Sequence, residues 1–247
     1  MKILLLILLT LTTSGLFSQA GKYFIDVAAG PSIPLGKFAE KEFAHSTKYL
    51  LSEHPPGNAR TGISARLTGG FHIRDNFGLL VSLRLATNKL ERETIERHII
   101  DELGPGVITI GAKRWQIVSA LAGAFIENTL STSLNYKLKL AAGAAAIKVP
   151  GYYYTWFDNS GQLPQAVQAN FNGRDLPITF AAQVGAEMNY TIGKNLYTLL
   201  SADFFYSQGA YKYTVAAVGF PVPVGTRIRE KHPVHSVNII AGLGYKW

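Results

Sequence analysis

The amino-acid sequence predicts an all-β fold, an eight-stranded antiparallel up-and-down transmembrane β-barrel with four long external loops and three short periplasmic turns. Eight segments alternate between apolar and polar residues, which is the period-two pattern of β-strands. The connections between these segments alternate between long and short. Charged residues make up only 16% of the chain, against roughly 25% in soluble domains. After residue 20 the chain nevertheless has no run of the about 18 apolar residues that a membrane-spanning helix needs.

The first 20 residues are interpreted as a secretory signal peptide. Lys2 supplies a positive N-terminal region, Ile3 to Leu11 form an apolar stretch, and Ser18 and Ala20 place small residues at the cleavage-recognition positions. An N-terminal membrane anchor is the alternative, but the apolar stretch is too short to span a bilayer. We therefore expect a signal peptide at residues 1–20 and a single barrel domain at residues 21–247.

The first three predicted strands alternate cleanly and lie at residues 23–30, 63–73 and 77–88. In the third, Leu79 and Val81 alternate with Ser82 and Arg84. Because successive side chains of a strand point to opposite faces, each of these strands has one apolar and one polar face.

The next three strands are predicted at residues 115–126, 134–146 and 178–190. The first of them is apolar on both faces, and the second ends in the small-residue tract Ala141 to Ala146. The third is regular, with Val184 and Met188 opposed to Gln183 and Glu187. The pattern therefore shows clearly which face of the third strand is apolar, but it does not separate the two faces of the first.

The last two strands are predicted at residues 196–206 and 237–247. The seventh strand is less regular but carries Asp203, whereas the eighth sets Ile239 and Leu243 against Asn238 and Lys246. The chain thus ends within an alternating strand.

The connections place all long loops at one end of the sheet. Tight turns are predicted at residues 74–76, 127–129 and 191–195. The long connections cover residues 31–62, 89–114, 149–177 and 207–236. Antiparallel strands put alternate connections at opposite ends, so the short turns and both termini share the other end. A compact soluble domain rarely needs four such loops.

The same alternation fits a soluble lipocalin-like barrel with its apolar face inward or a membrane barrel with that face outward. The polar faces consist mostly of small uncharged residues, which favours the membrane. Aromatic residues also lie next to the short turns, where an interfacial girdle is expected: Tyr23, Phe71, Phe77, Phe125, Tyr190, Tyr197, Tyr245 and Trp247. In hydrocarbon every backbone polar group must be paired, so the sheet is expected to close.

The whole mature chain resembles, in its architecture, the small Gram-negative outer-membrane β-barrel proteins of the porin-like and OmpA/OmpX-like kind. The resemblance rests on the signal peptide, the turn from Gly30 to Gly36 and the closing strand. It implies an outer-membrane location and folding by the barrel-assembly machinery. In that family the machinery reads the last strand, and the matching residues here are Gly242, Tyr245 and Trp247. An interfacial anchor is the alternative role for Trp247.

Charged residues on the polar faces predict a network inside the barrel, formed by Asp26, Arg66, Arg84, Lys137, Lys139, Glu187 and Asp203. Ordinary hairpin registers place Arg66 opposite Arg84 and near Asp26, although a slip of one residue would destroy this row. They also pair Lys139 with Glu187. Because side chains just fill an eight-stranded barrel, we expect a charge-satisfied plug rather than a narrow polar conduit.

The long connections carry three further signals. Residues 91–102 have mixed charges and are expected to form a short solvated helix. The aromatic residues at 152–157 are interpreted as an outer interfacial girdle, with a ligand-stacking platform as the alternative. The fourth long loop forms a basic external rim with Lys212, Arg227, Arg229 and Lys231. Outer-membrane lipid and the phosphates of lipopolysaccharide are its expected partners, and nucleic acid is not.

No catalytic residue, metal site or cofactor is predicted. The chain has no cysteine, and the neighbours His45 with Ser46 and His235 with Ser236 are expected by chance. The predicted function is a porin-like outer-membrane barrel with a structural, surface-binding or limited small-solute role. Two alternatives stay open: a barrel subunit of a larger envelope secretion or assembly complex with protein partners, and an outer-membrane lipid hydrolase.

Overall fold

The computed structural model describes residues 23–40, 57–150, 152–158, 167–172, 177–218 and 226–247. The predicted signal peptide lies outside the described residues and stays a prediction. The eight strands of the barrel wall are β1 (Tyr23–Leu35), β2 (Gly62–Arg74), β3 (Phe77–Asn88), β5 (Trp115–Thr129), β6 (Leu134–Lys148), β9 (Ile178–Thr191), β10 (Leu196–Val218) and β11 (Thr226–Lys246).

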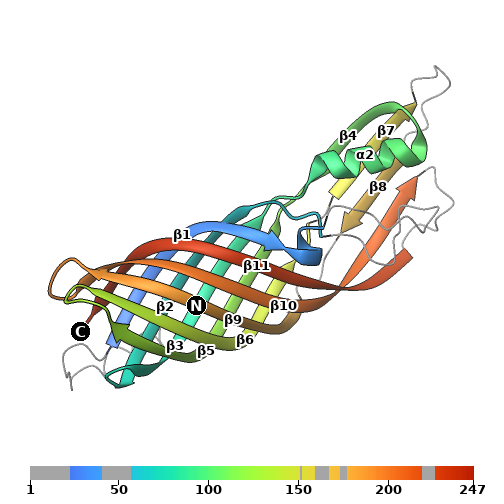
Figure 1. The fold of residues 1–247 in the computed structure, drawn as a ribbon. Coiled ribbons are helices and arrows are strands. Elements are labelled where there is room, and N and C mark those ends of the chain that lie inside the picture. Colours follow the sequence, from blue (N-terminus) through green and yellow to red (C-terminus); the bar gives the residue numbers. More distant parts are fainter. Residues whose placement is uncertain (1–22, 41–56, 151, 159–166, 173–176, 219–225) are drawn as a thin grey trace, which may run out of the picture.

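The eight wall strands form a closed antiparallel barrel (Figure 1). Each strand pairs with the next one around the wall, and β11 pairs both with β10 and with β1. The ladder between β1 and β11 runs from Phe24 opposite Lys246 to Leu35 opposite His235. At its end the backbones of Tyr23 and Trp247 exchange hydrogen bonds of 3.2 and 3.0 Å. The predicted eight-stranded antiparallel barrel is confirmed.

The wall is apolar outside and polar inside. On β3 the outward residues Val81 and Leu83 are 58% and 52% exposed, whereas the inward Ser82 and Arg84 are 2% and 3% exposed. The same alternation repeats on β9, where Val184 is exposed. This polarity is the reverse of a lipocalin-like barrel, so the soluble alternative is wrong for this chain.

The second and third predicted long loops contain additional helix and strands. The second holds the expected helix, α2 (Arg92–Leu103), and then β4 (Gly106–Ala112), while the third holds β7 (Tyr152–Asp158) and β8 (Val167–Asn172). These strands pair in the order β4–β7–β8 and join the far part of β10, forming an external sheet beyond the barrel. In Figure 1 this sheet projects from the long-loop end, with α2 beside β4.

The prediction of a fourth long loop at residues 207–236 is wrong over most of its length. There β10 and β11 continue as a paired hairpin up to Val215 opposite Thr226. Tyr211, Tyr213 and Val215 continue the alternation at every second position, but Gly209 and Pro233 suggest a loop. The short turn predicted at residues 127–129 also belongs to β5, and the chain turns after it.

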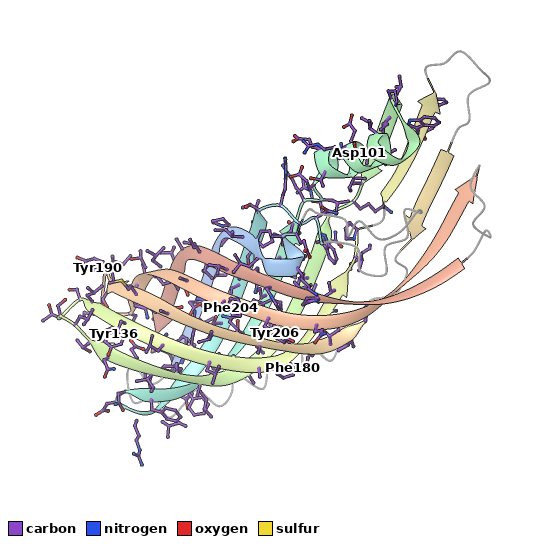
Figure 2. All side chains as sticks on the ribbon, turned by 45° about the vertical axis from the view of Figure 1, so that its right-hand side comes forward. Asp101, Tyr136, Phe180, Tyr190, Phe204 and Tyr206 are labelled. Atoms are coloured by element: carbon purple, nitrogen blue, oxygen red, sulfur yellow. The ribbon has the colours of Figure 1, made fainter. Side chains whose placement is uncertain are left out.

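The predicted girdles need two corrections. At the short-turn end Tyr23 stacks on Trp247, with ring centroids 6.2 Å apart, and Tyr136 and Tyr190 lie at the same end (Figure 2). Phe125 and Tyr197, however, are only 1% exposed and point into the barrel. Phe125 lies on β5, which is apolar on both faces, and Tyr197 lies on the less regular β10, so neither pattern assigns the face firmly. The aromatic residues at 152–157 lie in the external sheet rather than in the barrel wall.

Among the described residues, no helix has the length and hydropathy to cross a membrane.

Candidate functional site

The lumen of the barrel is filled by three layers of side chains. An aromatic layer with Phe24, Phe125 and Tyr197 lies at the short-turn end, and Phe24 and Phe125 meet edge to face at 5.4 Å. A charged layer lies in the middle. An outer apolar layer closes the long-loop end and consists of Phe38, Trp115, Ile117, Ile147, Phe205 and Val234, each at most 2% exposed.

Arg66 on β2 is the centre of the charged layer. Its Nη2 lies 2.6 Å from Glu187 Oε2 and 3.4 Å from Asp26 Oδ1, and its Nη1 lies 2.7 Å from Asp203 Oδ2. These carboxylates come from β9, β1 and β10. One guanidinium therefore joins strands on different sides of the barrel, at a site only 3% exposed.

Two lysines of β6 complete the ion-pair cluster. Lys139 Nζ lies 2.8 Å from Glu187 Oε2 and 3.0 Å from Asp203 Oδ1, and donates to Ser201 Oγ at 2.8 Å. Lys137 Nζ lies 3.4 Å from Glu187 Oε1 and 3.9 Å from the centre of the Phe24 ring. Every carboxylate of this layer thus faces at least one cation.

Arg84 has a different environment. Its Nη2 donates to Asn238 Oδ1 at 2.7 Å and to Ser236 Oγ at 3.1 Å, its Nε donates to Ser64 Oγ, and its guanidinium lies 4.3 Å from the Phe205 ring centre. Within the described residues no carboxylate forms a salt bridge with it. Neutral oxygens and an aromatic face therefore stabilise this buried cation.

All seven predicted lumen residues are buried inside the barrel. Arg66 stands opposite Arg84 as expected, and the expected contacts of Arg66 with Asp26 and of Lys139 with Glu187 are present. Arg84 adds no salt bridge to this row within the described residues, and Asp203 reaches Arg66 from across the lumen. Hairpin registers describe neighbouring strands, whereas this contact depends on the stagger of the whole barrel.

Glu127 is a lumen residue that the sequence analysis missed. The residue is 6% exposed. Its Oε1 lies 2.6 Å from Lys246 Nζ, and its Oε2 lies 3.1 Å from His72 Nε2. The prediction of a turn at residues 127–129 hid it. Its inward position could not be predicted from the parity of the strand, because β5 is apolar on both faces.

The long-loop end of the lumen is covered by the chain itself. A 3₁₀ turn, η2 (Gly36–Phe38), brings Phe38 against Trp115, with ring centroids 5.2 Å apart. The returning segment lies over them, since Ala59 N donates to Phe38 O and Trp115 Nε1 donates to Gly57 O. The charged layer is therefore separated from this end by packed apolar groups.

The predicted assembly residues lie along the end of β11. Gly242 sits opposite Ala28 and Leu199, where a Cβ would come within 2.0 Å of Val27 O, so a larger residue does not fit. Tyr245 and Trp247 point outward and are 45% and 38% exposed. Recognition by the assembly machinery stays a prediction.

The four predicted rim residues lie on the outer part of the β10–β11 hairpin. The register places Lys212 opposite Arg229, Arg227 opposite Thr214 and Lys231 opposite Ala210. These positions have the same parity as Phe204 and Val237, which point outward from the barrel. The positions of the rim therefore continue the outward face of the wall.

The described residues do not assemble a hydrolase site from the predicted neighbours. His235 stacks on Tyr206 at 5.1 Å, whereas Ser236 points into the lumen and accepts from Arg84. The two side chains thus lie on opposite faces of β11. His45 and Ser46 lie outside the described residues. Within the described part of the chain, no cluster of three or more metal-ligating side chains is found.

No family model matches this chain, and no curated protein matches it in sequence. Solved structures of small outer-membrane barrels are similar in fold. Neisserial surface protein A is 11% identical with a TM-score of 0.45, and a major outer membrane protein from Thermus thermophilus is 10% identical with a TM-score of 0.48. The attachment invasion locus protein Ail of Yersinia pestis is 13% identical with a TM-score of 0.41. Each match covers 93% of this chain and 100% of the other.

Replacing Arg66 by Met is expected to lower the free energy of unfolding by about 3–5 kcal/mol, because it leaves buried carboxylates with too few cations. Arg84→Met is the matched control, since Arg84 is equally buried but has only neutral partners, and about 1–3 kcal/mol is expected for it. Adding Glu187→Gln to Arg66→Met restores the charge balance and is expected to recover part of the loss. Urea unfolding of the folded barrel measures all three, and equal losses for both single variants would contradict the central role of Arg66.

Proposed function

We propose that this protein is an integral outer-membrane barrel with a non-conducting lumen, and that it acts by presenting its external sheet at the cell surface. The observation that carries the proposal is the construction of the barrel, which has an apolar outer face and a packed, charge-compensated lumen. The role is structural and surface-binding rather than the passage of solutes.

The outward face of the wall supports the membrane location. Leu140, Leu200 and Val81 are 65%, 55% and 58% exposed in the isolated chain, and burial of such surface stabilises by about 25 cal/mol per Å². The outward positions of β3 from 77 to 85 and of β9 from 178 to 190 carry no charge. Monomeric soluble proteins rarely expose so much contiguous apolar surface. Closed barrels of this kind are typical of bacterial outer membranes.

The filled lumen argues against solute passage. Ion pairs at 2.6 to 3.0 Å occupy its middle, and buried aromatic and aliphatic side chains pack on both sides of them. Moving a solute through would require several buried charges to separate, at a cost of about 3–5 kcal/mol for each broken pair. The barrel therefore serves as a stable anchor.

The external sheet is the part of the chain that is free to meet partners. The far ends of the 23-residue β10 and the 21-residue β11 continue beyond the wall into this sheet, and β4, β7 and β8 add to it. The basic positions of the hairpin continue the outward face of the wall. They therefore lie beyond its apolar band, at the level proposed for the lipid headgroups. This placement supports binding of lipopolysaccharide phosphates by charge-assisted hydrogen bonds.

The membrane location predicts different effects for an arginine at two equally exposed sites. Leu83→Arg, in the middle of β3, is expected to reduce the stability of the barrel in phospholipid vesicles by about 2–4 kcal/mol. Ile192→Arg, in a short turn with the same 52% exposure, is the matched control with an expected loss of about 0–1 kcal/mol. Urea titration of folding into vesicles measures both. A monomer that stays soluble without detergent would contradict the proposal.

The filled lumen predicts an absence of channel activity. Purified protein added to planar lipid bilayers is expected to insert without stable conductance steps, because the ion pairs and both apolar layers stay in place. A general porin in the same bilayers is the positive control for detection. Large and stable single-channel steps would show that the lumen conducts.

The basic hairpin predicts salt-sensitive binding to lipopolysaccharide. The double variant Lys212→Gln with Arg229→Gln is expected to weaken binding by about 2- to 30-fold, since each exposed ion pair contributes about 0.2–1 kcal/mol. Arg74→Gln with Lys194→Gln, at the short-turn end, is the matched control and is expected to change nothing. Binding to lipopolysaccharide-containing vesicles at low and high salt provides the measurement, and equal effects of the two doubles would refute the assignment.

A further inference from the structure

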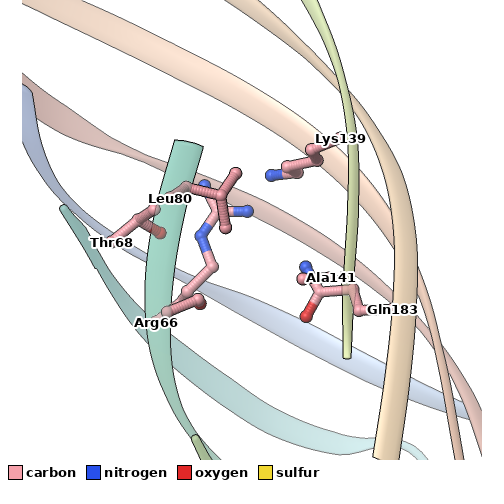
Figure 3. A pocket seen from close by; sticks show the side chains of 7 residues that line it. Arg66, Thr68, Leu80, Lys139, Ala141 and Gln183 are labelled. Atoms are coloured by element: carbon pink, nitrogen blue, oxygen red, sulfur yellow. The ribbon is translucent and has the colours of Figure 1, made fainter. Parts of the chain in front are cut away.

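A small cavity lies within the charged layer of the lumen. Its volume is about 10 Å³, and it is lined by Arg66, Thr68, Leu80, Ser82, Lys139, Ala141 and Gln183. Figure 3 shows these side chains pointing toward one another from β2, β3, β6 and β9. The cavity belongs to the lumen, but none of the ion pairs described above fills it.

Four of the residues that line this cavity have a polar atom without a hydrogen-bond partner. Arg66 Nε, Thr68 Oγ1, Ser82 Oγ and Gln183 Oε1 have no hydrogen-bond partner, although the four residues are only 2% to 4% exposed. An unsatisfied buried polar group costs about 1–3 kcal/mol. Because four such atoms belong to residues that line one cavity, a single group bound in the cavity could be the partner of several of them.

The bonding of Arg66 shows which of its hydrogens needs a partner. A guanidinium has five N–H groups. Two of the four on the terminal nitrogens face Ser201 and Asp203, and the other two face Asp26 and Glu187. The Nε–H is the one left, and Arg66 lines the cavity.

We infer that the cavity binds one water molecule, which accepts from Arg66 Nε and donates to Gln183 Oε1, with the hydroxyls of Thr68 and Ser82 as further partners. A buried water needs a space of about 10–15 Å³ and two to four polar partners, and this site supplies both. The water satisfies the fifth hydrogen of Arg66 and so fixes the guanidinium that holds the charged layer.

Other small occupants fit the site less well. A metal cation would lie beside the positive charges of Arg66 and Lys139. A halide is larger than a water molecule, and both of these cations already face Glu187 and Asp203. A neutral molecule that both donates and accepts matches the lining atoms.

High-resolution crystal structures test the inference. For the unmodified chain we expect one density peak within hydrogen-bond distance of Arg66 Nε and Gln183 Oε1. In Gln183→Leu the peak is expected to be lost, and Thr68→Val serves as a second variant with lower occupancy should Gln183→Leu fail to fold. Ser119→Ala is the matched control, because its hydroxyl is equally buried and unpaired but does not line the cavity, so the peak is expected to stay.

Two results would overturn the inference. An empty cavity in the unmodified chain would show that the four polar atoms are left unsatisfied. Crystals grown with bromide would give an anomalous peak in the cavity if the occupant were a halide, whereas a water molecule gives none.

Discussion

Closure of the sheet between β1 and β11 is the constraint on which the rest of this structure depends. In hydrocarbon an unpaired backbone group has no water to bond, so an open edge strand would be costly along its whole length. The β1–β11 ladder runs almost the full length of β1, and the backbones of Tyr23 and Trp247 complete it. With eight strands, closure also fixes the width of the interior, which leaves room for side chains and little else.

That narrow interior explains the charged layer. Alternation forces every second residue of each strand inward, and in the middle of the barrel most of these inward residues are polar or charged. Charges confined in this way need partners from other strands, and Arg66 obtains them from β1, β9 and β10. The apolar layers at both ends keep the local dielectric low, which strengthens these contacts and penalises any unpaired group. The charged layer thus links strands across the lumen and stabilises the wall.

The sequence predicts what depends on neighbours along a strand or across one hairpin. The eight strands, the position of Arg66 opposite Arg84 and the pairing of Lys139 with Glu187 follow from alternation and turn length. The contact of Arg66 with Asp203 could not be predicted, since 137 residues separate them and barrel stagger decides their distance. The inward positions of Phe125 and Tyr197 could not be predicted, because β5 is apolar on both faces and β10 alternates less regularly. The external sheet was missed because a hairpin with Gly209 and Pro233 resembles a loop, although its backbone pairing continues the wall.

The same period of two connects the wall with the external sheet. Phe204 and Val237 occupy outward positions within the barrel, and the register carries this parity along the hairpin to Lys212 and Arg229 without a shift. In the proposed orientation, the face of these two strands that is apolar in the wall includes the four basic positions beyond it. Because the strands are continuous, any force on the external sheet is transmitted to a wall braced by Arg66. A closed, filled barrel suits this role better than a hollow one, since an anchor gains from rigidity and a channel does not.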